Sequence, residues 1–262
     1  MSETLQLELR SQRASIRLTR PDTHNAFTPQ LIVELTDALE SAAAHADTRV
    51  IVLSAEGRSF SAGADLNWMR AAGALPESAN LADAKKLARL FRTLYRSPKP
   101  VIARVHGAAI GGGLGLVAAC DIVVAAPEAR FGLTEVRLGL APAIIGPYVA
   151  EAIGLRQTRR YALSGELFGA ERALALGLVH EIAAADQLDA TVDEFARLVA
   201  LGGPRAAGEI KDLLRNLGRG PGDDAVLEDC TRRIARLRGG AEAAEGLAAF
   251  LDKRAPSWQG ND

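Results

Sequence analysis

Cysteine is scarce in this chain, and its two copies lie far apart. Cys120 and Cys230 belong to no CxxC motif and to no cluster with histidine. We therefore expect neither a disulfide framework nor a metal site, and a reducing, cytoplasmic location fits best. No apolar stretch approaches the roughly 20 residues that span a membrane. Residues 1–10 also lack the apolar core of a signal peptide.

An excess of charge of one sign is lacking as well. The 31 basic and 32 acidic residues leave a formal net charge of −1, so no global field attracts nucleic acid or an anionic membrane. Apolar residues make up 48% and charged residues 24% of the 262 positions. This composition predicts a folded chain with one sizeable core.

Hydrophobic periodicity predicts alternating strands and helices in the first half of the chain. Residues 5–9 and 16–18 alternate apolar and polar side chains, as the strands of a hairpin do. Thr28 and Pro29 form a good N-cap and first-turn pair for an amphipathic helix. Short continuous apolar runs, typical of strands buried on both faces, occupy residues 50–53, 101–103 and 122–125.

The second half of the chain is predicted to be mainly helical from Pro142 onward. Its last helix, over residues 241–254, has Leu247, Phe250 and Leu251 on one side and should dock on another surface. We therefore expect an α/β fold with repeated ββα units. Residues 1–200 would form its core, and residues 201–262 a helical C-terminal region.

Two segments of small residues each follow a predicted buried strand. Residues 59–66 read SFSAGADL, and residues 106–115 read HGAAIGGGLG. Glycine lets a ligand approach the backbone closely, and amides at a helix start have no intrahelical acceptor. Two such turns on adjacent strands would supply the paired N–H donors that a thioester carbonyl requires when it becomes an enolate.

Each segment taken alone has a plainer interpretation. The first could be a tight turn, and the second a point of close helix packing. A dinucleotide site is disfavoured, because the glycines lack the GxGxxG spacing and no phosphate-binding Lys-Ser/Thr pair follows.

The order of four motifs gives the chain a clear resemblance. RPDTHNAF, FSAGADL, HGAAIGGGLGLVAACDIVVA and FGLTEVRLGL are similar to those of the crotonase (enoyl-CoA hydratase/isomerase) superfamily. The resemblance implies a spiral of ββα units and a helical C-terminal trimerisation region, with a homotrimer or homohexamer as the assembly. It implies an acyl-CoA thioester substrate and no separate cofactor, since coenzyme A is part of the substrate.

The resemblance also assigns roles to residues. Ala64 and Gly112 would be the oxyanion-hole donors, and Glu135 the catalytic acid and base, although a glutamate is more often a solvated surface residue. Asp65 has an equally good structural role as a helix N-cap, and His24 as a loop residue. The expected substrate-binding residues are His24, Asn25, Ala26, Ala62, Asp65, Leu66, Gly111, Gly115 and Tyr148, with Phe250 and Lys253 coming from a neighbouring subunit.

One departure from the family pattern lies at Gly115, where many hydratases carry a second glutamate. We expect its absence to leave extra room and to remove a negative charge beside the substrate, which favours a branched or acidic acyl group. This departure and the segments 64–70, 137–148 and 245–258 resemble bacterial methylglutaconyl-CoA hydratases of leucine breakdown. Arg70 or Arg137 would pair with the acidic tail.

Three other functions stay open at this point, and the first is a general short-chain enoyl-CoA hydratase. An enoyl-CoA isomerase needs only one base, so Glu135 alone would suffice. A non-catalytic RNA-binding protein is suggested by the basic residues between positions 85 and 99. However, these charges spread around a helix and have no aromatic stacking platform. A solvated face or a contact with the coenzyme A phosphates is the better interpretation.

Overall fold

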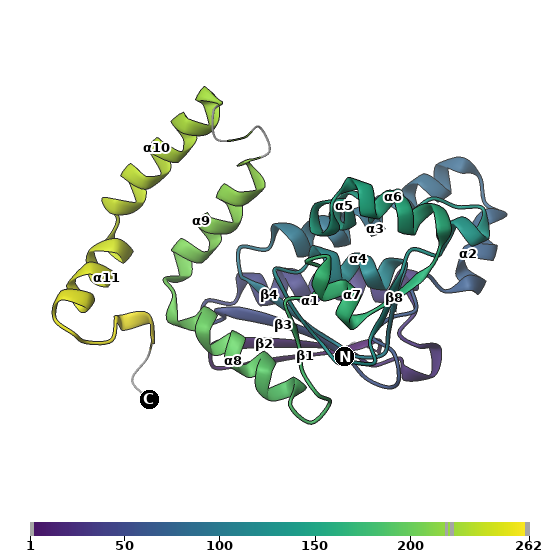
Figure 1. The fold of residues 1–262 in the computed structure, drawn as a ribbon, viewed down its shortest axis with the longest axis horizontal. Helices are drawn as coiled ribbons and strands as arrows, with labels where there is room; N and C mark the ends of the chain where they lie inside the picture. Colours follow the sequence, from purple (N-terminus) through teal and green to yellow (C-terminus); the bar gives the residue numbers. More distant parts are fainter. Residues whose placement is uncertain (1–2, 218–219, 221–222, 260–262) are drawn as a thin grey trace.

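A six-stranded sheet forms the centre of the computed structural model, which describes residues 3–217, 220 and 223–259 (Figure 1). Its first two strands are antiparallel and the remaining pairs are parallel. The predicted hairpin and the three predicted buried strands are all confirmed. In spatial order the strands are β1 (Leu5–Arg10), β2 (Arg13–Leu18), β3 (Val50–Ala55), β4 (Val101–Val105), β6 (Ile122–Ala125) and β9 (Glu181–Ile182).

A smaller sheet of three short strands lies beside the first. Its central strand pairs with one neighbour in parallel and with the other in antiparallel orientation. The first two of these strands directly follow β4 and β6 along the chain, which produces the repeated ββα units that the resemblance implied. Sequence patterns missed them because three residues are too few to show a period. They are β5 (Ala108–Ile110), β7 (Arg130–Gly132) and β8 (Leu167–Gly169).

Helices cover both faces of the large sheet, so its central strands are buried on two sides. Ile51 and Leu53 of β3 belong to the larger core, whereas Val50 and Val52 pack in a second cluster with α8. The N-cap prediction is also confirmed, since Thr28 Oγ1 accepts from the Leu31 amide. The larger core is built on α1 (Pro29–Ala44), α3 (Glu77–Arg96), α4 (Gly112–Ala119) and α5 (Gly146–Ile153), and the second on α8 (Leu188–Leu201).

The last three helices extend from the core as an arm, with α10 and α11 standing apart from the sheet (Figure 1). Its apolar residues Leu247, Phe250 and Leu251 are 57%, 82% and 77% exposed. The last helix ends earlier than predicted, and Lys253 beyond it has a left-handed φ of 55°. The arm comprises α9 (Pro204–Arg215), α10 (Asp224–Arg238), α11 (Ala241–Leu251) and the described residues after it, 252–259.

Two buried cations join this arm to the core. Lys211 of α9 donates to Asp121 Oδ2 at 2.6 Å. Arg49, 8% exposed at the start of β3, donates to the carbonyls of Gly202 and Trp258. The remaining helices are α2 (Leu66–Gly73), α6 (Leu155–Ser164) and α7 (Ala170–Ala175). No helix in the described part of the chain is long and apolar enough to cross a membrane.

Candidate active site

The first small-residue segment is held in a parallel bridge against Phe27. The Phe27 amide donates to Gly63 O at 2.7 Å, and the Phe27 carbonyl accepts from Asp65 N at 2.9 Å. In such a bridge the residue opposite, here Ala64, directs its own N–H and C=O to the other side. The Ala64 amide therefore points away from Phe27.

Each of the three consecutive glycines is required for a different steric reason. Gly111 has a φ of +52°, which side chains rarely adopt. A Cβ on Gly112 would lie 2.5 Å from Phe27 Cε2, and one on Gly113 would overlap the Ser61 carbonyl oxygen. The triplet thus lets α4 begin in direct contact with the first segment.

The two loops bring the Ala64 and Gly112 amides to one place. A Cβ on Gly63 would lie 3.3 Å from Gly112 N and 2.8 Å from Ile110 O, so the loops are in contact. Gly112 is the first residue of α4, and its N–H has no partner within the helix. Within residues 3–217, 220 and 223–259, neither amide donates to a protein acceptor. Both remain available to an oxygen atom of a ligand.

Glu135 lies beside these amides with an unused carboxylate oxygen. It begins a short 3-10 helix, Glu135–Leu138, and its Oε1 lies 3.0 Å from where a Gly111 Cβ would be. Its Oε2 is buried and has no hydrogen-bond partner among the described residues. Burial raises the pKa of Glu135 above its ordinary value, against a smaller opposing effect of a backbone hydrogen bond. Such a carboxyl group is suited to exchange protons.

The turn at residues 24–26 is hydrogen-bonded to the first small-residue segment and to neighbouring loops. Asn25 is fully buried, and its side-chain amide donates to the carbonyls of Glu56 and Ser59 at 2.9 Å each. The carbonyls of the three turn residues accept from Ala62 N, Ser61 Oγ and Arg20 Nη1, respectively. The turn therefore has a structural role, and its contact with coenzyme A stays a prediction.

The residues that flank Ala64 divide into an exposed and a structural group. Ala62 is exposed, and Leu66 is 65% exposed, so both are open to a ligand. Asp65 caps α2, because its Oδ1 accepts from Asn67 N at 2.9 Å and from Trp68 N at 3.0 Å. The structural interpretation of Asp65 is confirmed.

The expectation of extra room at Gly115 is wrong. Gly115 is buried in α4, where an added Cβ would overlap Ile145 and lie 2.9 Å from Phe91 Cε1. The Tyr148 ring packs at a tilt against that of Phe91, with their centroids 5.9 Å apart. The space that a longer side chain would need is already filled, although the absence of a second carboxylate stands.

Two other groups of predicted residues lie on the arm and on α3. Phe250 and Lys253 are on the arm, and Figure 1 shows α11 standing apart from the sheet. Their contribution to a neighbouring subunit's site stays a prediction. On α3, Lys86 pairs with Asp83 and Arg89 pairs with Glu40. These ion pairs reduce the basic surface that suggested RNA binding.

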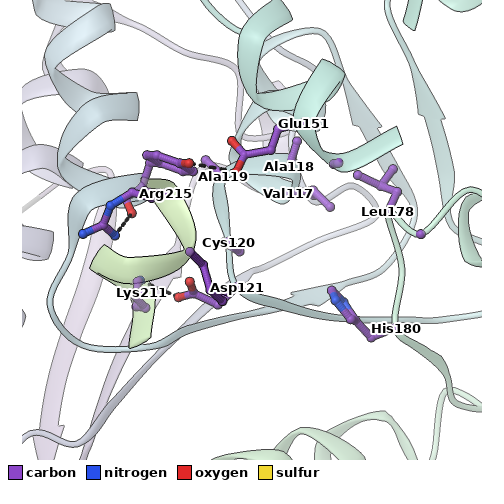
Figure 2. Close-up of a pocket in the computed structure, with 14 residues that line it drawn as sticks. Val117, Ala118, Ala119, Cys120, Asp121, Glu151, Leu178, His180, Lys211 and Arg215 are labelled. Carbon is purple, nitrogen blue, oxygen red and sulfur yellow. Dashed lines mark hydrogen bonds and ion pairs between the residues drawn. The ribbon is translucent and has the colours of Figure 1, made fainter. Parts of the chain in front are cut away.

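A separate cleft of about 340 Å³ lies where the arm meets the core. Figure 2 shows Lys211 directed at Asp121, with Cys120 beside them and His180 across the cleft. None of Glu135, Ala64 or Gly112 lines it. Nor does any group of three or more His, Cys, Asp or Glu side chains suited to a metal occur in the part of the chain that the structure describes.

Sequence patterns missed two residues that shape the site, Phe27 and Ser61. Phe27 is 1% exposed and Ser61 is fully buried, and both contact the two amide loops. Phe27 lies within one of the quoted motifs and could have been noted there as an apolar residue after a turn. Ser61 has no distinguishing signal, because a serine among small residues fits a turn equally well.

Comparisons with known proteins agree with this geometry. The family model described as Enoyl-CoA hydratase/isomerase matches residues 9–261. The crystal structure of an enoyl-CoA hydratase from Shewanella pealeana superimposes with a TM-score of 0.95 at 43% identity, covering 98% of this chain and 96% of that one. The 2,3-dehydroadipyl-CoA hydratase of Escherichia coli is 34% identical over 96% of this chain and 97% of its own length.

A relative with a different named reaction also aligns over most of the chain. The 4-chlorobenzoyl coenzyme A dehalogenase-2 of an Arthrobacter species is 31% identical over 92% of this chain and 87% of its own length. Family membership therefore leaves the reaction to be argued from the site. On the family match and the structural likeness together, this chain belongs to the enoyl-CoA hydratase/isomerase family of the crotonase superfamily, and it is an enzyme of that family.

Proposed function

We propose that this enzyme adds water across the double bond of an enoyl-CoA thioester, with Glu135 as its single proton-transfer carboxylate. The Ala64 and Gly112 amides form the oxyanion hole in this proposal. The observation that carries it is the buried, unpaired Oε2 of Glu135 beside two amides that have no acceptor within the described residues. A proton acceptor and two oxyanion donors are the groups that this reaction requires.

The proposed mechanism needs no other charged group. The Glu135 carboxylate removes a proton from water, and the water oxygen bonds to Cβ of the substrate. The double-bond electrons shift to give an enolate, whose negative charge develops on the thioester oxygen against the Ala64 and Gly112 N–H groups. Protonated Glu135 then delivers its proton to Cα. Because burial raises the pKa of Glu135, its carboxylate is a stronger base for the first step, the removal of the proton from water.

The filled position at Gly115 supports a reaction with one carboxylate. Ile145 and Phe91 occupy the space there, so Glu135 must both accept and donate the proton. Only one negative charge then faces the reacting carbons, and an acyl group that carries its own carboxylate is repelled less. Room for a branched acyl group must come from elsewhere in the site. Leu66 and Leu138, each close in sequence to a proposed catalytic residue, are 65% and 56% exposed and offer apolar surface.

The substrate that fits these features best is methylglutaconyl-CoA, an intermediate of leucine breakdown. The resemblance in segments 64–70, 137–148 and 245–258 supports it. So does the similarity to a relative named for the dicarboxylic 2,3-dehydroadipyl-CoA. Arg137 follows Glu135 closely and forms no ion pair with any described residue. Among the same residues, the Arg70 side chain donates only to Asn67 Oδ1. Either guanidinium is available to bind the distal carboxylate.

Turnover on a panel of thioesters tests this proposal. We expect a higher kcat/KM for methylglutaconyl-CoA than for dehydroadipyl-CoA or crotonyl-CoA, measured as loss of enoyl-thioester absorbance. Arg137→Gln and Arg70→Gln should identify the tail contact. The responsible variant raises KM for methylglutaconyl-CoA and leaves KM for crotonyl-CoA unchanged, which makes crotonyl-CoA the internal control. A preference for crotonyl-CoA in the wild type contradicts the substrate assignment.

Isomerisation is a second candidate, favoured by the same lone carboxylate. One base that carries a proton between two carbons can move a double bond without water. A 3-enoyl-CoA supplied in heavy water distinguishes the two reactions. An isomerase gives the 2-enoyl product, whereas a hydratase leaves that substrate unchanged and converts 2-enoyl-CoA to the hydroxy product.

The assembly is part of the proposal. Leu247, Phe250 and Leu251 expose a contiguous apolar side of α11 on the arm, and monomers rarely leave such surface uncovered. A homotrimer or homohexamer would cover it.

A further inference from the structure

The hydroxyl group of Ser61 lies at the junction of three segments that build the site. Ser61 is fully buried. Its backbone pairs with β5, through Ser61 N to Ala108 O at 3.0 Å and Ile110 N to Ser61 O at 2.9 Å. Its Oγ donates to Asn25 O at 2.9 Å and accepts from Gly63 N at 3.3 Å. Ser61 thus connects β5 through its backbone, and the turn at Asn25 and the loop that carries Ala64 through its hydroxyl.

The hydrogen bond from the Gly63 amide to this hydroxyl restricts the backbone conformation at Gly63. Gly63 has a φ of +84°, and glycine can leave such a conformation at little cost. Its carbonyl and the Ala64 N–H belong to one planar trans peptide and point in opposite directions. Phe27 N, 2.7 Å from Gly63 O, holds this peptide from one side. Ser61 Oγ holds the preceding peptide, so both planes that meet at Gly63 are fixed.

We propose that Ser61 is a positioning residue of the oxyanion hole: its hydroxyl locks Gly63 so that the Ala64 N–H faces the thioester oxygen. This inference rests on the proposed function, since it assigns a role toward the same amide. Without the hydroxyl, the Gly63 N–H and the Asn25 carbonyl each lose a partner. The loop can then rotate about Gly63 and turn the Ala64 amide away from the substrate.

The test compares Ser61→Ala with a matched control, Ser97→Ala. Ser97 is 3% exposed, and its Oγ likewise donates to one backbone carbonyl and accepts from one backbone amide, both of Lys99. Both substitutions remove two hydrogen bonds of a buried serine side chain. Only the first removes them from the proposed oxyanion loop. The assays are kcat and KM per folded enzyme on the best enoyl-CoA of the panel, and the Tm.

A spectroscopic probe reports on the amide itself. Butyryl-CoA labelled with 13C at the thioester carbonyl has no double bond to hydrate, and its infrared C=O band shifts down when the oxygen accepts hydrogen bonds. We expect Ser61→Ala to lower kcat about tenfold with little change in KM. We also expect it to return the bound C=O band part of the way to its position in water. Ser97→Ala should lower Tm comparably and alter neither quantity.

The proposal is overturned if folded Ser61→Ala keeps the wild-type kcat and C=O band. Where Ser61→Ala does not fold, Ser61→Cys replaces it, because a thiol is a weaker donor and acceptor of similar shape. The same two changes are then expected at smaller size, and their absence overturns the proposal. A wild-type enzyme that neither shifts the band nor hydrates any thioester overturns the oxyanion hole itself. By contrast, an active wild-type enzyme with an equally active Ser61→Ala variant overturns only the role of Ser61.

Discussion

The loops that carry Ala64 and Gly112 differ from the Glu135 carboxylate in how much of their hydrogen-bonding capacity the protein uses. Around Ala64, hydrogen bonds from Phe27 and to Ser61 hold the neighbouring peptides, and the outward Ala64 N–H has no acceptor among the described residues. Glu135 instead keeps a buried oxygen without a partner among the described residues. The amides are held rigidly for a charge that appears only during the reaction, whereas the carboxylate is kept poorly solvated so that it exchanges protons.

Removing the carboxylate should have the largest effect. Glu135→Gln keeps the shape of the side chain and loses the exchangeable proton, so we expect kcat for hydration to fall about 10²–10⁴-fold. Glu171→Gln, at an exposed position on α7, is the control and should keep wild-type turnover. Steady-state kinetics decide the matter. A Glu135→Gln enzyme within a few-fold of wild type would remove Glu135 from the mechanism.

Deleting the Gly112 amide N–H tests the oxyanion hole, the rigid part of the site. Gly112→Pro removes the N–H and should lower kcat about 10²–10³-fold. Because any Cβ there meets Phe27, Gly112→Ala is the matched variant, with the same steric intrusion and an intact amide. Circular dichroism confirms the fold of both. The activity ratio of Ala to Pro measures the amide alone, and a ratio near one would show that Gly112 is not a donor.

A side chain at Gly115 tests packing more than chemistry. Gly115→Glu must displace Ile145 and Phe91, and we expect it to cost about 1–3 kcal/mol of unfolding free energy, as overpacked cores do. Adding Ile145→Ala should recover part of that loss by providing space. Chemical denaturation of the single and double variants measures both. If Gly115→Glu is as stable as wild type, α4 and α5 separate more easily than their contact indicates.

The pH dependence of stability should show the smallest effect, and it tests directly whether Glu135 is buried away from solvent. Because burial raises its pKa in the folded state, the folded protein holds the proton more tightly than the unfolded chain does. Stability from this group is therefore lost as pH rises from the unfolded to the folded pKa. The Tm of Glu135→Gln relative to wild type should rise across that window. A constant difference would mean that the carboxylate is solvated as well in the folded as in the unfolded state.

Local patterns predicted what depends on neighbours in sequence, and failed where distant residues meet. Thr28 and Pro29 predicted a helix start, and the apolar run at residues 50–53 predicted a buried strand. Both predictions succeeded because capping and hydrophobic patterning depend on neighbouring residues. At Gly115 the sequence showed that a carboxylate is missing. It did not show that Ile145, thirty positions away, fills the space. That contact depends on how α4 packs against α5.

The candidate site shows the same limit. The two glycine-rich segments were found because glycine itself is informative where a Cβ cannot fit. Asn25 was expected near the substrate, and the structure uses its side chain inside the protein. Ser61 could not be singled out, since its importance comes from the carbonyl and the amide that its hydroxyl contacts.

The contact between Arg49 and Trp258 makes the end of the arm part of the sheet's cooperative unit. Trp258 O accepts from Arg49 Nη1 at 3.0 Å and from Gln12 Nε2 at 3.1 Å, and thus meets both the turn after β1 and the start of β3. If the last segment detached, a buried guanidinium would lose an acceptor at the entrance to the central strands. Detachment and fraying of the sheet are therefore energetically coupled. Amides of β3 should exchange hydrogen faster whenever the C-terminal segment is loosened.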